Sequence, residues 1–193
     1  MTGVCGAGKS TLSSEFSRSI GCSWGDYADI MLEVMGENNK DKIQYLERTE
    51  KSTIIEKAEL LVSQRFVNTS TNDTLHIFEN HLSIVQDGEI ITFPLSDYER
   101  YNTIGLVVVE ALSEVILNRR KSDATRNRLI ETADLINEQQ RVNLEEAKKV
   151  SSRLKIPYLR VVNDDKNSSI ATLTTWYSSL EGTPDSHKVS HRR

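Results

Sequence analysis

The sequence has few cysteines, few prolines and no long apolar runs, and each shortage excludes a class of protein. Its 193 residues include 2 cysteines and 3 prolines. Cys5 and Cys22 form neither a CxxC pair nor a disulfide framework, which is typical of a reducing compartment. The longest apolar runs, such as IGLVVVEAL at 104–112, are too short to span a bilayer. No signal-peptide pattern is present. We therefore expect a cytoplasmic protein with no membrane partner.

The charge is nearly balanced, with 24 basic and 28 acidic residues and a net charge of −4. This balance gives no reason to expect a nucleic-acid partner. With 37% hydrophobic and 27% charged residues, the composition fits a folded globular protein of one domain. We expect residues 1–181 to form that domain. The polar tail at 182–193 has little to bury, and we expect it to be disordered.

Apolar runs alternate with amphipathic segments along the chain, which predicts an α/β fold with a mainly parallel sheet. The spacing of apolar residues predicts helices over 9–20, 29–36, 41–65, 112–121, 132–154 and 170–180. Strands are predicted at 73–79, 103–110 and 158–162, with a short one near WGDY at 24–27. Asp29 is the expected N-cap of the second helix. The Asp87-Gly88 pair predicts a hairpin over 83–93.

A phosphate-binding loop is the clearest motif. Gly3 to Ser10 read G-x-x-x-x-G-K-S and run into an amphipathic helix, which is the context that this motif requires. Glycines let successive backbone N–H groups point at phosphate oxygens, and the helix N-terminus adds its dipole. Lys9 supplies a charge for the β- and γ-phosphates, Ser10 can ligate Mg²⁺, and Thr11 can cap further N–H groups.

A loop of this kind needs a carboxylate beside its metal ion, usually at the end of a neighbouring strand. Glu79 closes LHIF and Glu110 closes GLVVV, so both are candidates. Glu79 is the favoured one, and either could instead pair with an arginine. His81 is interpreted as a turn histidine with a structural hydrogen bond.

A basic cluster, NRRKSDATRNR at 118–128, is the second motif. A run of charges is usually a solvated surface. Next to a phosphate loop, however, arginines that close over the transferred group would stabilise its negative charge. Forked guanidinium groups suit that task better than lysines. We therefore predict a lid at about 119–128.

The loop, the cluster and the order of elements together resemble adenylate kinases of the archaeal type, from residue 1 to about 180. YADIMLEV at 27–34 is similar to the family's F-G-D-x-M-L-E-V segment, and DATRNR at 123–128 is similar to its lid. The resemblance implies a three-layer P-loop NTPase fold and transfer of the γ-phosphoryl of Mg-ATP to a nucleoside monophosphate, AMP being the expected acceptor.

The resemblance also implies roles for individual residues. Arg126 and Arg128 would act on the transition state beside Lys9, with Arg120 supporting them, and Glu79 would join Ser10 near Mg²⁺. Residues implied at the ATP site are Gly3, Gly6, Ala7, Gly8, Lys9, Ser10, Thr11 and Asn163. Where the family carries an arginine for the AMP phosphate on its long helix, this chain has Gln44, with Lys42 or Arg48 as substitutes. The hairpin at 83–93 is a further departure from the family's pattern.

In that fold a central strand precedes the loop, and Met1 and Thr2 are too few to form it. Unpaired strand groups cost about 1–3 kcal/mol each when buried. We therefore expect the natural chain to begin upstream, with a damaged sheet or a swapped strand as the alternatives.

Two other functions stay open: an ATP-dependent kinase of another small molecule, and a nucleotide-binding regulator without phosphotransfer. The sequence is also compatible with an oligomer.

Overall fold

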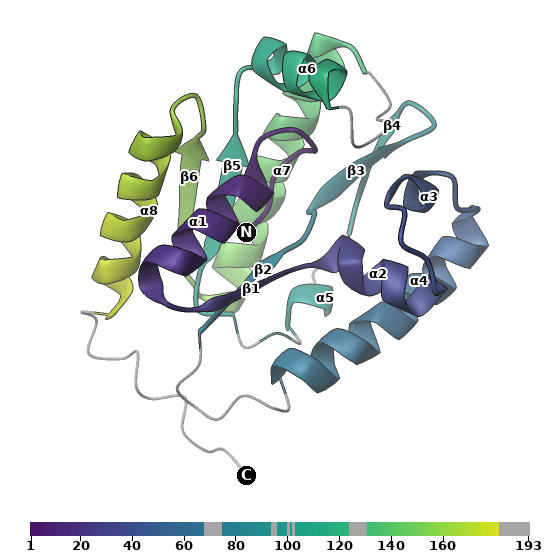
Figure 1. Cartoon of the computed structure of the whole chain (residues 1–193), viewed down its shortest axis with the longest axis horizontal. Coiled ribbons are helices and arrows are strands. Elements are labelled where there is room, and N and C mark those ends of the chain that lie inside the picture. Colours follow the sequence, from purple (N-terminus) through teal and green to yellow (C-terminus); the bar gives the residue numbers. More distant parts are fainter. Residues whose placement is uncertain (68–74, 94–95, 100, 102, 124–130, 182–193) are drawn as a thin grey trace.

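The computed structural model of the chain describes residues 1–67, 75–93, 96–99, 101, 103–123 and 131–181 (Figure 1). Its helical elements are α1 (Lys9–Ile20), α2 (Tyr27–Met35), α3 (Asp41–Gln44), α4 (Arg48–Val62), the π-helical η1 (Ser63–Val67), α5 (Ser96–Glu99), α6 (Ser113–Ser122), α7 (Ala133–Leu154) and α8 (Lys166–Glu181). Its strands are β1 (Ser23–Asp26), β2 (His76–Glu79), β3 (Ser83–Gln86), β4 (Glu89–Thr92), β5 (Leu106–Glu110) and β6 (Tyr158–Val162).

Parallel strands form the central layer, as the alternation of elements predicts. β1 pairs with β2, and β5 pairs with β6, both in parallel register. The α/β class and its mainly parallel pairing are therefore confirmed. Nowhere in the described part of the chain does a helix combine the length and hydropathy that a bilayer crossing needs.

Met1 and Thr2 lie between the two pairs of strands. Thr2 donates to the carbonyl of Val107 at 2.7 Å and accepts from the amide of Val109 at 2.8 Å, in the pattern of a parallel bridge. On the other side, the amino group of Met1 donates to the carbonyl of Phe78 at 2.6 Å. The backbones of Met1 and Thr2 therefore bond both neighbouring strands at the end nearest the loop, although these two residues are too few to form a complete strand.

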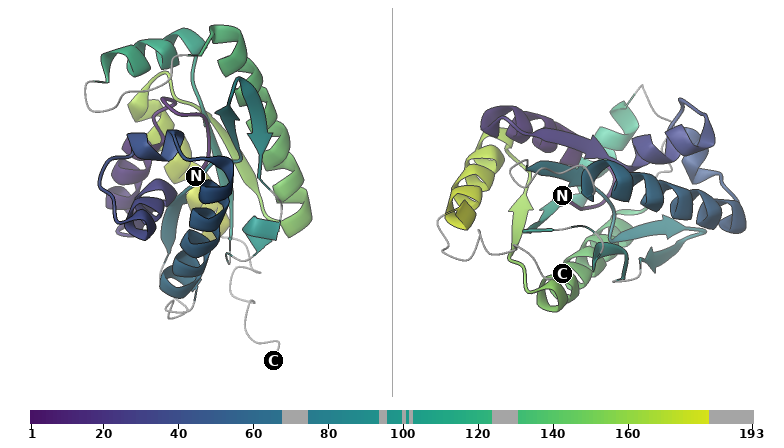
Figure 2. Two further views of the ribbon diagram at one scale, coloured as in Figure 1. Left: turned by 90° about the vertical axis from the view of Figure 1, so that its right-hand side faces the viewer. Right: turned by 90° about the horizontal axis from the view of Figure 1, so that it is seen from below.

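β5 is buried on both faces, which explains why its sequence is continuously apolar. Val107 and Val109 belong to a core cluster that includes Leu12 of α1 and Leu173 of α8. Leu106 and Val108 instead join a cluster with Ala147 and Val150 of α7. Helices therefore cover the sheet from both sides, with α1 and α8 opposite α7 (Figure 2).

A second group of helices, α2, α3 and α4, packs around its own apolar cluster beside β2. The continuous helix predicted over 41–65 is wrong, because the chain leaves the helical conformation at 45–47. This break lets Ile43 and Leu46 both pack on the cluster that contains Ile54 and Ala58. Gln44 accordingly ends α3 and is not part of the long helix.

The start of α2 also differs from the prediction. Its N-cap is Asp26, whose carboxylate accepts from the amide of Ala28 at 3.0 Å, rather than Asp29. The hairpin predicted over 83–93 is present, with β3 and β4 antiparallel and positive φ angles of 53° at Asp87 and 80° at Gly88. Thr132 is the N-cap of α7, and its hydroxyl accepts from the amide of Leu135.

Candidate active site

The glycine-rich loop connects Thr2 to α1 and packs closely against neighbouring residues. Gly8 caps α1 in the left-handed region, with φ at 93°. A Cβ there would lie 2.2 Å from Nδ2 of Asn163. Only glycine satisfies both the backbone angle and this contact, so the last glycine of the motif is required by local geometry.

Three side chains brace the loop through its carbonyl groups. Arg120 donates from Nε and from a terminal nitrogen to the carbonyl of Cys5 at 3.0 and 2.8 Å. Arg119 and Asn163 both donate to the carbonyl of Ala7, at 3.1 and 2.8 Å. Because the carbonyl and N–H of a trans peptide point in opposite directions, this turns the amides of Gly6 and Gly8 away from the braces. An anion would meet those amides together with the N-terminus of α1.

Lys9 is buried within the same loop. Its Nζ donates to the carbonyls of Gly3 at 2.9 Å and Val4 at 3.2 Å. These contacts hold the ammonium group inside the curve of the loop, which is the position that the motif predicts for a phosphate-binding charge.

Ser10 and Glu79, the two residues assigned to the metal ion by the sequence, meet at the mouth of the loop. The Ser10 hydroxyl donates to Oε2 of Glu79 at 2.9 Å. Oε1 of Glu79 is buried and has no hydrogen-bond partner among the described residues. Burial raises the pKa of Glu79, which the nearby charge of Lys9 partly offsets. A hydroxyl beside an unsatisfied carboxylate oxygen suits a hard cation such as Mg²⁺, so the residues present fit this ion.

Glu110, the other candidate carboxylate, has a different partner. Its Oε2 accepts from Nε of Arg160 at 2.7 Å, which is the arginine pairing considered for it. His81 has a structural contact, with Nδ1 3.1 Å from the carbonyl of Gly3. Within the described ranges, no group of three or more His, Cys, Asp or Glu residues could hold a metal ion.

The lid prediction can be followed only in part. Arg126 and Arg128 lie outside the described residues. Arg120 lies at the end of α6, and its side chain is 2% exposed and forms an ion pair with Glu131. Arg120 therefore bonds the loop from one side and the segment before α7 from the other.

Arg119 is the residue that sequence reasoning missed. It belongs to the predicted basic cluster, but the motif assigned no role to it. In the structure its guanidinium reaches Ala7 of the loop and donates to the carbonyl of Asn163 at 3.1 Å. Both arginines of the neighbouring pair meet the loop, and the sequence of α6 does not specify which carbonyl each one bonds.

A cavity of about 590 Å³ lies beside the loop, within the size range of small-molecule sites. Its walls come from α2, α3 and α4 on one side and from the β3–β4 hairpin on the other. Arg120 and Cys5 line it, and Arg120 bonds the carbonyl of Cys5, so the cavity reaches the loop. The hairpin is therefore a wall of the candidate acceptor site.

A family model described as an AAA domain matches residues 2–137. The chain belongs to this family. Two curated relatives of this AAA-domain chain are adenylate kinases. That of Thermoplasma acidophilum is 26% identical over 148 residues, covering 74% of this chain and 76% of the relative. That of Thermococcus kodakarensis is 27% identical over 150 residues, covering 74% of each. The resemblance to archaeal adenylate kinases is thereby confirmed, and the chain is a P-loop protein of the kinase type.

Solved structures confirm the fold of the AAA-domain chain. Shikimate kinase from Acinetobacter baumannii, in complex with shikimate, has a TM-score of 0.62 at 13% identity and covers 94% of this chain and 93% of its own. Deoxyadenosine kinase from M. mycoides has a TM-score of 0.55 at 14% identity and covers 93% of this chain and 100% of its own. The predicted P-loop NTPase fold is therefore correct.

Proposed function

We propose that the chain transfers the γ-phosphoryl group of Mg-ATP to a nucleoside monophosphate. The observation that carries the proposal is the junction at Arg120, where a braced phosphate loop meets a cavity of nucleotide size. Donor and acceptor would share this junction, which is the geometry that direct transfer between two phosphates requires. The names of the curated relatives make AMP the reference acceptor.

In this proposal the residues of the loop and of its neighbours have separate roles. The amides of Gly6 and Gly8 and the ammonium group of Lys9 would hold the ATP phosphates. Ser10 and Glu79 would hold Mg²⁺ and its water shell, and the ion would neutralise charge that develops on the transferred group. Asn163 lies against the loop and would contact the bound ATP.

The arginines of the lid complete the proposed mechanism. Arg120 would keep the loop in place and contribute positive charge, while Arg126 and Arg128 would close over the transferred phosphoryl group. In this proposal residues 1–181 form one kinase domain, with the lid at about 119–128.

The test is acceptor-dependent release of ADP from ATP, measured with and without Mg²⁺ across nucleoside monophosphates and small alcohols. We expect ADP only when Mg²⁺ and a nucleoside monophosphate are both present. Turnover with an alcohol alone would favour a kinase of another small molecule. Tight ATP binding with no acceptor-dependent ADP release would favour a nucleotide-binding regulator.

A further inference from the structure

The two ends of the acceptor cavity differ in their chemistry. Cys5, Arg120 and His81 line the end at the loop. Lys51 of α4 and Asp87 of the β3–β4 turn line another part, which we call the outer end. In Figure 1 the β3–β4 turn and the start of α4 lie at the right of the molecule, and the loop before α1 lies nearer its centre. A phosphoryl acceptor must place its attacking oxygen beside the γ-phosphate, at the loop. Its other end therefore points toward Lys51 and Asp87.

Part of each wall is apolar, on the helical side and on the hairpin side. Tyr27 and Ile55 come from the helical side, and Ile84, Ile91 and Phe93 come from the hairpin side. A slot lined in this way suits a flat, aromatic group such as a nucleobase. Lys51 and Asp87 add a charged donor and a charged acceptor to this lining, the kind of groups that distinguish one base from another.

Lys51 is half-buried at this outer end, and its side chain forms no hydrogen bond or ion pair within the part of the chain that the structure describes. Burial lowers the pKa of Lys51, and the negative charge of Asp87 acts in the opposite direction. The two groups are thus near enough to influence each other, yet they do not form an ion pair. Both groups line the cavity, so both can contact the edge of one bound ligand.

We propose that Lys51 and Asp87 select a 6-oxopurine base, so that GMP is a better acceptor than AMP. This inference rests on the nucleoside monophosphate kinase function proposed above. The lysine ammonium group only donates hydrogen bonds, and guanine offers O6 and N7 as acceptors. The aspartate carboxylate only accepts, and guanine offers N1–H and the 2-amino group as donors. Adenine carries an amino donor at position 6, which leaves the ammonium of Lys51 without that partner.

The test compares GMP, IMP and AMP as acceptors, by kcat/KM and by calorimetric binding, in the wild type and in Lys51→Gln and Asp87→Asn. We expect the wild type to favour GMP over AMP by about tenfold, the discrimination typical of one well-placed base contact. Lys51→Gln should remove most of this preference by weakening GMP and IMP, with AMP little changed. Asp87→Asn should weaken GMP more than IMP, because IMP lacks the 2-amino group.

Lys57→Gln is the matched control, since Lys57 is exposed on the same helix and does not line this cavity. It should keep the wild-type preference. A wild type that uses or binds AMP as well as GMP would overturn the inference, and so would an equal loss for all three acceptors in Lys51→Gln. If no acceptor releases ADP, the proposed kinase function fails, while calorimetry still decides the base preference.

Discussion

The donor loop and the acceptor cavity meet at Arg120 but are built in opposite ways. In the loop, the carbonyls of Cys5 and Ala7 are already bonded by Arg119, Arg120 and Asn163. At the outer end of the cavity, Lys51 and Asp87 have no such partners among the described residues. A site that must hold the same phosphates in every cycle benefits from a fixed backbone. A site that must distinguish among acceptors needs polar groups that only the right ligand satisfies.

The donor loop and the acceptor cavity should therefore respond differently to substitution. Changes at the loop should affect all acceptors alike, because they act on the donor. Changes at the hairpin and at the start of α4 should affect some acceptors and spare others.

The largest effect is expected for Lys9→Ala. Removal of the buried ammonium group takes a positive charge from the phosphates, and we expect kcat/KM to fall by about 10²–10³-fold or more for every acceptor. ADP release across the acceptor panel measures this, and circular dichroism checks the fold. Lys166→Ala is the control, because Lys166 is exposed and pairs with Glu15. Undiminished turnover in Lys9→Ala would contradict the assignment of the loop as the ATP site.

Arg120→Ala should be the most damaging change to stability. Arg120 is buried, and its removal leaves the carboxylate of Glu131 without its ion-pair partner. Loss of one partner from a buried pair costs about 3–5 kcal/mol, so the free energy of unfolding in urea should fall by about that amount. Restored stability in the double variant Arg120→Ala, Glu131→Ala would attribute the loss to the unpaired charge. A single variant as stable as the wild type would contradict the bracing role.

Much of the fold and the donor half could be predicted from the sequence, because their signals are local. The loop motif, the capping Thr132 and the Asp87-Gly88 turn each lie within a few consecutive residues. The periodicity of apolar residues likewise located α1, α7 and β5, although element ends shifted by a few residues.

The remaining features depend on contacts between residues far apart in the chain. Arg119 meets Ala7 across 112 positions, and nothing in the basic cluster specifies that carbonyl. The break between α3 and α4 arises because Ile43 and Leu46 pack on a shared cluster, which overrides a continuous helical pattern. Lys51 and Asp87 come together only because α4 faces the hairpin. The place of Thr2 between two strands was missed for the same reason.

Glu79 should give the loop a measurable dependence of stability on pH. Burial raises its pKa, so the folded state holds this proton more tightly than the unfolded state does. The contribution of Glu79 to stability is therefore full below its ordinary pKa of 4.5 and is lost as the pH rises through the raised value. A single proton limits the slope within that window to at most about 1.4 kcal/mol per pH unit.

Urea unfolding at a series of pH values, without Mg²⁺, measures this slope. Glu79→Gln should remove it, since the amide does not titrate, while Glu145→Gln on the surface of α7 should leave the profile as in the wild type. A Glu79→Gln profile that is parallel to the wild type throughout the window would show that Glu79 is not the titrating group.

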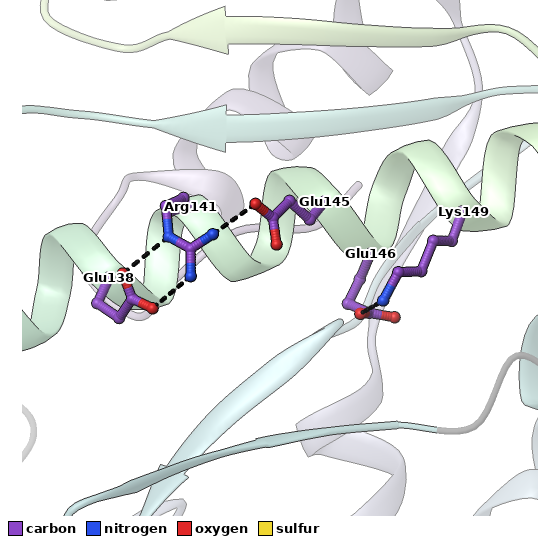
Figure 3. Close-up of polar contacts among 5 residues, drawn as sticks. All are labelled: Glu138, Arg141, Glu145, Glu146 and Lys149. Carbon is purple, nitrogen blue, oxygen red and sulfur yellow. Dashed lines mark hydrogen bonds and ion pairs between the residues drawn. The ribbon is translucent and has the colours of Figure 1, made fainter.

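The smallest effect is expected on the outer surface of α7, where Arg141 lies between Glu138 and Glu145 (Figure 3). Both contacts measure 2.5 Å, but the side chains are about half exposed, and water and salt screen their charges. Arg141→Ala should therefore leave kcat/KM and the urea midpoint unchanged at 0.15 M salt, with at most a slight shift at low ionic strength. Arg120 and Arg141 each pair with a carboxylate and differ in burial, so an equal loss of stability in the two alanine variants would contradict burial as the reason that Arg120 matters.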